Sequence, residues 1–292
     1  MTIPSVLRID VGSSGMLSAH PPAGRRRVDL GIVIPLLVIA AAAVISFVGP
    51  IFWGFKPNEV DADSILDGMS WTHPLGTDEL GRDVLARLMA AAKVSMGAVV
   101  ISVTVSLVVG LVPGLAAGYF GGRLDRAVTR VVDIVVTMPA FVVAITVVAL
   151  LGPGLTNAMV AAGIVLAPRV IRVARSCVLS LREDTFVEAA KVLGGTDWWI
   201  VRRHILPNVL GPLLVVLSTL AAYSMFLEAG LSFLGLGVQP PQASLGAMVK
   251  LGVPHLSADP RLVYAPGVVI ACLVLACNHL GDRLSHRRHG RR

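Results

Sequence analysis

The sequence predicts an all-α, polytopic membrane protein with six transmembrane helices. The chain is 55% hydrophobic and only 15% charged, with a mean hydropathy of +0.78, which is too apolar for an ordinary soluble domain. Several apolar runs approach the roughly 20 residues that a spanning helix needs. Basic residues separate these runs instead of forming one patch, so the net charge of +7 does not indicate nucleic-acid binding.

The N-terminal part of the chain predicts a tail followed by a membrane anchor. Residues 1–28 carry no apolar periodicity and are expected to form a flexible cytoplasmic tail. The run Leu30–Val48 is longer than the apolar region of a typical signal peptide, and no clear small-residue cleavage site follows it. We therefore expect a retained first transmembrane helix, which makes up residues 29–93 together with an outer loop.

Five further spans complete the predicted bundle, with a core over residues 94–280 and a basic cytoplasmic tail over 281–292. With both termini in the cytoplasm, most Lys and Arg residues fall on the inner side of a cell membrane, as the positive-inside rule requires. The expected spans are about Val94–Phe120, Val131–Leu151, Asn157–Val173, Val209–Gly230 and Leu262–Leu280.

The span that starts at Asn157 is short before it reaches charge. A helix from Asn157 to Arg169 extends about 18 Å, less than a hydrocarbon core of about 30 Å. Arg169 and Arg172 must therefore snorkel or face a wet cavity in the bundle, and Asp133 is a candidate partner. An ion pair inside the bundle is favoured over contact with a substrate.

A polar insertion at about residues 182–207 separates two apolar runs. Thr185 and Glu188 have the spacing of a capping box. Gly194 is expected to end that helix in a left-handed conformation, and Gly195-Thr196-Asp197 offers a second N-cap. Pro207 precedes the next apolar run. We expect two short helices bent at a glycine hinge on the cytoplasmic side.

Charged residues also mark the predicted outer side, in a cluster of Asp78, Glu79, Arg82 and Asp83. This cluster either folds the loop as an ion-pair network or contacts an extracytoplasmic protein. Thr77 or Asp78 is a candidate N-cap for the following helix. Glu228 lies near the outer end of a span, where an unpaired carboxylate costs several kcal/mol. Pairing of Glu228 with Arg82 is favoured over a position in a pathway.

Motifs for chemistry are absent from the sequence. It contains no HExxH, no CxxC and no phosphate-binding G-x-x-x-x-G-K-[ST] pattern. Three cysteines without framework spacing indicate free thiols, at Cys177, Cys272 and Cys277. We therefore expect a protein that is not an enzyme and binds neither a metal nor a cofactor itself.

The polar insertion carries a family resemblance. Its Glu188-Ala189-Ala190, Gly194 and Leu206-Pro207 resemble the EAA loop of permease subunits of ATP-binding-cassette (ABC) importers. The broad family places isoleucine three residues before the proline, whereas this chain has His204 there. This variant resembles the dipeptide, oligopeptide and nickel branch of the family.

Three further segments resemble the "C" permeases of that branch, and the resemblance covers roughly residues 70–280. They are residues 73–83 (HPLGTDELGRD), residues 118–122 (GYFGG) with Asp125-Arg126, and residues 228–241 (EAGLSFLGLGVQPP). Ala86, Ala91 and Leu245 depart from the branch pattern, which weakens inference about the substrate and not about the family.

The resemblance implies a type I ABC importer permease fold with cytoplasmic EAA coupling helices. It implies half of a translocation pathway for di- or oligopeptides, completed by a second homologous permease. Two cytoplasmic ATPase subunits would carry ATP and Mg, and an extracytoplasmic substrate-binding protein would deliver the solute. The implied ATPase-coupling residues are Glu188, Ala189, Ala190, Gly194, Leu206 and Pro207. Capping is an equal alternative for Glu188, and membrane anchoring is favoured over ATPase contact for Trp198 and Trp199.

Two alternatives remain at this point. The same kind of machine would also import nickel or another small solute. An ATP-independent secondary transporter is more distant, because that class predicts an inverted repeat or several charges at mid-span. The sequence contains no evident repeat of this kind, and its mid-span charges are few.

Overall fold

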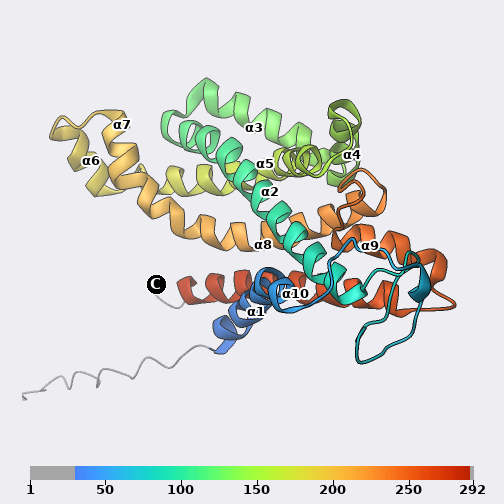
Figure 1. Ribbon diagram of the computed structural model, residues 1–292. Helices are drawn as coiled ribbons and strands as arrows, with labels where there is room; N and C mark the ends of the chain where they lie inside the picture. Colours follow the sequence, from blue (N-terminus) through green and yellow to red (C-terminus); the bar gives the residue numbers. More distant parts are fainter. Residues whose placement is uncertain (1–29, 290–292) are drawn as a thin grey trace, which may run out of the picture.

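The computed structural model describes residues 30–289, and this part of the chain is helical without a strand. The tail predicted for residues 1–28 lies outside it. The long helices run side by side, with the 182–207 insertion projecting at one end and α9 at the other (Figure 1). The α-helices are α1 Leu30–Phe52, α2 Val84–Phe120, α3 Gly122–Thr137, α4 Ala140–Leu151, α5 Leu155–Leu181, α6 Thr185–Val192, α7 Asp197–Ile200, α8 Leu206–Phe233, α9 Leu245–Gly252 and α10 Arg261–His289.

Four helices are long and apolar enough to cross a membrane. They are α1, α2, α10 and the continuous helix Asp197–Phe233, which contains α7 and α8. The bent pair α3–α4 counts as a fifth crossing if it forms one span. Length and composition in the described residues therefore give four or five apolar spans, and the predicted fourth span falls within α5.

The predicted continuous span Val131–Leu151 is wrong. The chain breaks between α3 and α4, which meet at 96°. Met138 is extended, with φ −86° and ψ 140°, and Pro139 is the N-cap of α4. Proline lacks a backbone N–H and forces the preceding residue out of the helical region, so the break is encoded at Met138-Pro139.

Helix ends also differ from the prediction. Helix α2 begins ten residues before the predicted Val94, because Asp83 caps it by accepting a 2.6 Å hydrogen bond from the backbone N–H of Ala86. The predicted caps Thr77 and Asp78 lie outside this helix. Helix α10 continues past Leu280 to His289, so the basic segment predicted as a tail is helical as far as the structure describes it.

Helices α2 and α5 pack through small residues on α2. The stripe repeats every fourth residue and consists of Ala98, Ser102, Ser106, Gly110, Gly114 and Gly118, all buried. A Cβ atom added at Gly110 would lie 2.6 Å from the Cβ of Val170, and one added at Gly118 would lie 2.7 Å from the Cβ of Val178. Small residues in this spacing let helix backbones approach closely in a membrane.

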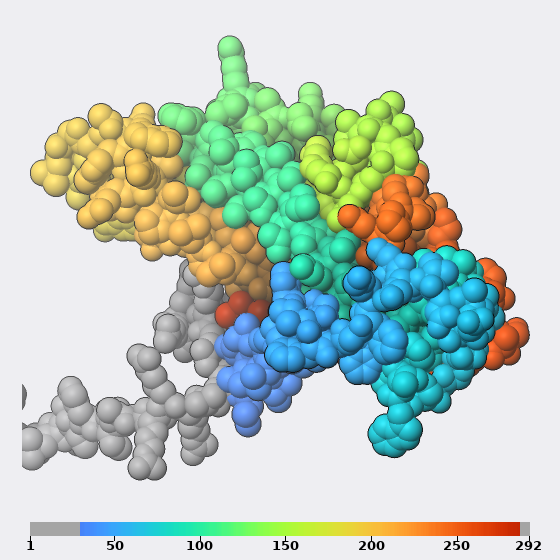
Figure 2. Space-filling model, in the orientation of Figure 1, coloured from blue at the N-terminus to red at the C-terminus, as the bar shows by residue number. Residues whose placement is uncertain are grey.

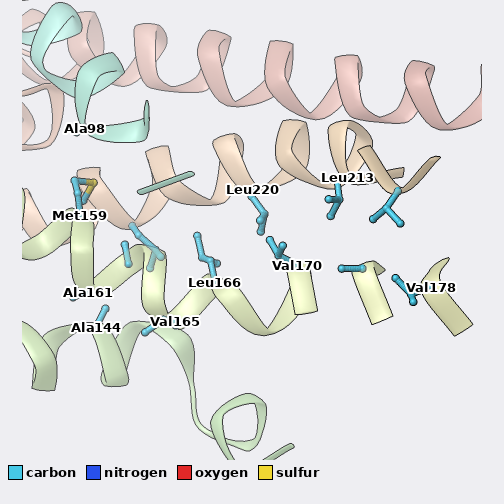
Figure 3. Close-up of a cluster of buried hydrophobic side chains, with 14 of the residues drawn as sticks. Ala98, Ala144, Met159, Ala161, Val165, Leu166, Val170, Val178, Leu213 and Leu220 are labelled. Atoms are coloured by element: carbon cyan, nitrogen blue, oxygen red, sulfur yellow. The ribbon is translucent and has the colours of Figure 1, made fainter. Parts of the chain in front are cut away.

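Helix α5 is the centre of the apolar core. It packs against α2, α4 and α8. Leu213 and Leu220 of α8 point toward α5, where Leu166 and Val170 face them (Figure 3). Neighbouring helices cover much of α5. Its covered faces do not contact lipid, so they need not be apolar.

The α2–α5 contact generates a stability prediction. The Gly114→Ala methyl would lie 2.8 Å from the Cβ of Ala174, so we expect the free energy of unfolding to fall by about 1–3 kcal/mol. This loss occurs although alanine favours helix over glycine by about 1 kcal/mol. Thermal unfolding of the protein in detergent measures it. Gly97→Ala is the control, because nothing lies within 4 Å of its added Cβ. Equal midpoints for the two variants would contradict the close packing.

Candidate docking arm and polar sites

Residues 182–207, called the arm below, form a helical hairpin that projects beyond the ends of α2 and α5. The arm is the yellow lobe at the left of the molecule (Figure 2). Its first helix, α6, is capped by Asp184 through backbone bonds alone, and Thr185 is already helical. The predicted capping box between Thr185 and Glu188 is therefore wrong by one residue, because Asp184 takes the cap position.

Gly194 ends α6 as predicted. Its φ of +81° is left-handed, and its N–H donates to the carbonyl of Lys191. The N–H of Gly195 donates to the carbonyl of Ala190 at 3.0 Å. This pair of hydrogen bonds is a Schellman motif, which favours glycine at the left-handed position. Thr196 then caps α7, also as predicted, by accepting from the N–H of Trp199 at 3.4 Å.

The second helix of the arm is not a separate short helix, which corrects the prediction. Helix α7 passes through a π-helical segment, Val201–Ile205, directly into α8. The N–H of Leu206 donates to the carbonyl of Val201, five residues back. Pro207 follows directly after the π-helical segment, inside the continuous helix, where it cannot donate a backbone hydrogen bond. The arm is thus one end of a 37-residue helix with α6 folded against it.

The arm is fixed to the bundle at Tyr119, near the end of α2. The Tyr119 hydroxyl donates a 2.7 Å hydrogen bond to Asp197 of α7. The ammonium of Lys191 in α6 lies 5.6 Å from the centroid of the same ring. Tyr119 therefore contacts both helices of the arm, a role that its place in the 118–122 segment did not reveal.

Apolar side chains extend the core into the arm. The buried residues Val187, Ala190, Ile200 and Ile205 belong to the same cluster as the inner faces of α5 and α8. Core packing and the Tyr119 contacts act together, so a displacement of the arm must also move α2, α5 and α8.

The tip of the arm presents apolar side chains to the outside. Val192 and Leu193 are each 87% exposed. Trp198, 72% exposed, instead lines a groove between the arm and the end of α2. Glu188 and Ala189 are also exposed, whereas Ala190 faces inward. A cluster of exposed apolar residues on a rigid projection is typical of a protein-docking surface.

The His204 imidazole packs against aromatic rings inside the arm. Its ring centroid lies 4.9 Å from that of Trp199 and 6.1 Å from that of Phe186. An apolar side chain such as isoleucine also suits an environment of aromatic rings. The arm thus holds Phe186, Trp199 and His204 against one another and leaves Trp198 on its surface.

At the opposite end of the bundle, the predicted charged cluster divides in three, and Glu79 alone contacts His255, at 3.2 Å. Asp78 accepts a 2.7 Å hydrogen bond from the guanidinium group of Arg82 and forms a 3.3 Å ion pair with Arg87. Asp83 accepts from the indole N–H of Trp53 at 3.1 Å and contacts the imidazole Nδ1 of His73 at 2.8 Å. These bonds fold the loop onto the start of α2.

Glu228 does not pair with Arg82, which corrects the favoured prediction. Glu228 is fully buried, and its carboxyl oxygens accept 2.8 Å hydrogen bonds from Ser95 of α2 and Ser232 of α8. The Ser95 hydroxyl also accepts from the N–H of Leu245, the first residue of α9. Arg82 is unavailable because Asp78 holds it. This polar cluster therefore joins α2, α8 and α9.

The charges predicted to lie in the membrane separate into different environments. Arg172 of α5 forms a 3.0 Å ion pair with Asp133 of α3, which is one of the predicted arrangements. Arg169 instead stacks over Tyr223 of α8, with its guanidinium carbon 3.8 Å from the ring centroid. A cation over an aromatic face is a stabilising contact within a bundle.

Close-packed spanning helices and a projecting helical arm define a polytopic membrane protein. The chain belongs to the family described as "Binding-protein-dependent transport system inner membrane component", whose model matches residues 106–288. It is a permease component of an ABC importer of the peptide branch, located in the inner membrane, and not an enzyme.

Curated relatives are named as transport system permeases, and the matches cover most of this chain and of theirs. A putative peptide transport system permease protein of Brucella suis is 36% identical, covering 94% of this chain and 92% of that protein. The dipeptide transport system permease protein DppC of Alkalihalophilus pseudofirmus is 38% identical, covering 86% and 83%. The glutathione transport system permease protein GsiD of Pectobacterium atrosepticum is 37% identical, covering 78% and 75%.

A solved structure agrees with the fold. Inward-facing conformations of the MetNI methionine ABC transporter match with a TM-score of 0.56 and 21% sequence identity. The match covers 69% of this chain and 95% of that chain. At this identity the likeness concerns the fold alone, and it agrees with an ABC permease architecture.

The Glu228 cluster generates a second stability prediction. Glu228→Ala leaves the hydroxyls of Ser95 and Ser232 without their acceptor in a buried site. We expect a loss of about 2–4 kcal/mol in the free energy of unfolding. Glu228→Gln keeps polar atoms at both positions and should cost at most about 1 kcal/mol. Thermal unfolding of the two variants tests this difference.

Glu79→Ala is the control for the Glu228 variants. Glu79 lies at the same end of the molecule but keeps about a third of its side chain exposed, at 34%, beside His255. Its replacement should change the unfolding midpoint little. If Glu228→Gln were as damaging as Glu228→Ala, hydrogen bonding alone would not explain the site.

Proposed function

We propose that this chain forms half of the translocation pathway of an ATP-driven importer of di- or oligopeptides. The names of the relatives, which concern peptides, a dipeptide and glutathione, support peptides over nickel. A second homologous permease supplies the other half, and an extracytoplasmic binding protein delivers the solute. Two cytoplasmic ATPase subunits bind ATP and Mg.

Six crossings with both termini in the cytoplasm fit this role. The crossings are α1, α2, the bent pair α3–α4, α5, α8 and α10. The 27-residue α5 extends about 40 Å, enough to cross a bilayer. Only six of the 25 Lys and Arg residues lie toward the outer side in this arrangement, either in outer loops or in the outer halves of crossings: Lys56, Arg82, Arg87, Lys93, Lys250 and Arg261.

The exposed tip of the arm is the observation that carries the proposal. A solvated projection gains nothing by itself from exposing Val192 and Leu193, whereas a partner groove would bury them. The EAA residues Glu188 and Ala189 share this solvent-facing side, and Gly194 turns the chain between the two helices. We assign the tip to the ATPase and the Tyr119 contact to transmission of its movement.

Roles for the remaining candidate residues follow from their positions. Leu206 and Pro207 join the arm to α8, so they would carry the movement into the membrane. Asp78, Arg82 and Asp83 would shape an outer surface for the binding protein. Glu228 would hold α9 on the bundle and would not line the pathway.

Replacement of one tip residue tests the docking role. Leu193→Asp should abolish co-purification of the ATPase, because it places a charge in an apolar interface. The fold should persist, since the Leu193 side chain is 87% exposed. Affinity purification of the co-expressed complex measures the bound ATPase, and thermal unfolding checks the permease.

Trp71→Asp is the matched control, because Trp71 is fully exposed at the opposite end of the molecule. We expect this variant to retain the ATPase. If the Leu193→Asp variant kept the ATPase and the Trp71→Asp variant lost it, the cytoplasmic and outer ends of the molecule would be the reverse of those proposed. If both variants kept the ATPase, the arm tip would have no docking role.

A further inference from the structure

Helix α3 is held to α5 mainly by charge. Val132 is its single buried residue within the described structure. The guanidinium of Arg175 in α5 donates two hydrogen bonds to the carboxylate of Asp125, one of them 2.7 Å long. The Arg172–Asp133 pair joins the same two helices one to two turns further along. Two ion pairs, and little apolar packing, therefore connect α3 to α5.

A groove of about 960 Å³ lies beside these ion pairs, lined by α3 and by Arg175 of α5. Its two acidic residues, Asp125 and Asp133, are already paired with arginines of α5. Three arginines of α3 also line it, namely Arg123, Arg126 and Arg130. None of these three forms an ion pair within the described part of the chain, so the groove carries an excess of positive charge.

The two sides of α3 differ in polarity. Spacings of three and four residues place the three arginines on one side, about 4.5 and 6 Å apart along the axis. Leu124 and Val131, exposed to 43% and 62%, lie outside the groove lining. In a membrane, an apolar side suits lipid, whereas unpaired guanidinium groups require water.

We propose that this groove is a water-filled wall of the cytoplasmic half of the pathway and guides solutes that carry a carboxylate. The passage of solute along the groove rests on the proposed function, whereas the presence of water in the groove does not. Guanidinium groups bind carboxylates in a bidentate manner, and a cationic cleft with low-dielectric walls concentrates anions. The spacing of the arginines lets a carboxylate pass from one to the next. Water beside each arginine keeps every contact weak enough for release.

Cysteine labelling of the assembled transporter tests the groove without requiring transport. Thr137→Cys places a thiol in the groove lining, and Val131→Cys is the control on the apolar side. Both are made after replacement of Cys177, Cys272 and Cys277 by serine. The probes are membrane-impermeant methanethiosulfonates, one bearing a sulfonate and one a trimethylammonium group. The anionic probe should react about tenfold faster at position 137 than at 131.

The charge of the groove is tested by a second substitution. Arg130→Gln should lower the ratio of anionic to cationic reaction rates at position 137 several-fold. Arg203→Gln should leave that ratio unchanged, because Arg203 is an exposed arginine of the arm and does not line the groove. Equal labelling at 131 and 137, or a ratio unaffected by Arg130→Gln, would overturn the inference.

Uptake measurements separate this inference from the proposed function. In the reconstituted complex, Arg126→Gln should raise KM several-fold for a dipeptide with a free carboxylate and leave KM unchanged for its C-terminal amide. Equal effects on the two peptides would overturn the carboxylate role while the importer stands. If the unmodified complex showed no ATP-dependent peptide uptake, the proposed function would fail, whereas the labelling result would still decide whether the groove holds water.

Discussion

The close approach of α2 to α5 is the contact on which the rest of the structure depends. In a membrane, lipid solvates apolar side chains as well as another helix does, so association relies on tight packing. The stripe that ends in Gly110, Gly114 and Gly118 supplies that packing along the half of α2 nearest the arm. It places Tyr119 beside the point where α5 enters the arm. A bulkier side chain in this stripe would separate α2 from both α5 and the arm.

A second set of bonds fixes the same helix at its other end. The buried hydroxyl of Ser95 connects α2 to Glu228 of α8 and to the first turn of α9. Helix α2 is therefore held by hydrogen bonds at one end, by close backbone packing along its middle, and by Tyr119 at the arm. Such a helix acts as a strut between the two sides of the molecule. Helix α3 lacks this support on its α5 side, where two ion pairs and little apolar packing hold it.

The sequence predicted the elements that follow from local chemistry. The left-handed Gly194 and the Thr196 cap were correct because their hydrogen bonds lie within a few residues. The capping box failed for a related reason, since Asp184 competes with Thr185 for the same cap. Pro139 carried the information for the break between α3 and α4, but apolar composition across Val131–Leu151 concealed it.

Contacts between residues far apart in the sequence were harder to predict from the sequence. The preference of Glu228 for Ser95 over Arg82 depends on which helices meet, and hydropathy does not determine that. The Tyr119–Asp197 bond spans 78 residues of sequence and left no local pattern. The small-residue stripe has a readable period of four, yet its partner α5 could be identified only from the packed helices. Arg172 and Asp133 were the exception, because opposite charges in apolar runs have few partners.

The Tyr119 contacts and the shared core predict that the arm and α2 move as one body, without pivoting at Gly194. Spin labels at Thr185 on the arm and Val100 on α2 report this directly, because both side chains are exposed and neither belongs to the tip assigned to the ATPase. Their distance distribution, measured by pulsed electron resonance in the assembled transporter, should be the same with and without bound ATP. A nucleotide-dependent shift of that distance would contradict the claim and make the arm a hinged lever.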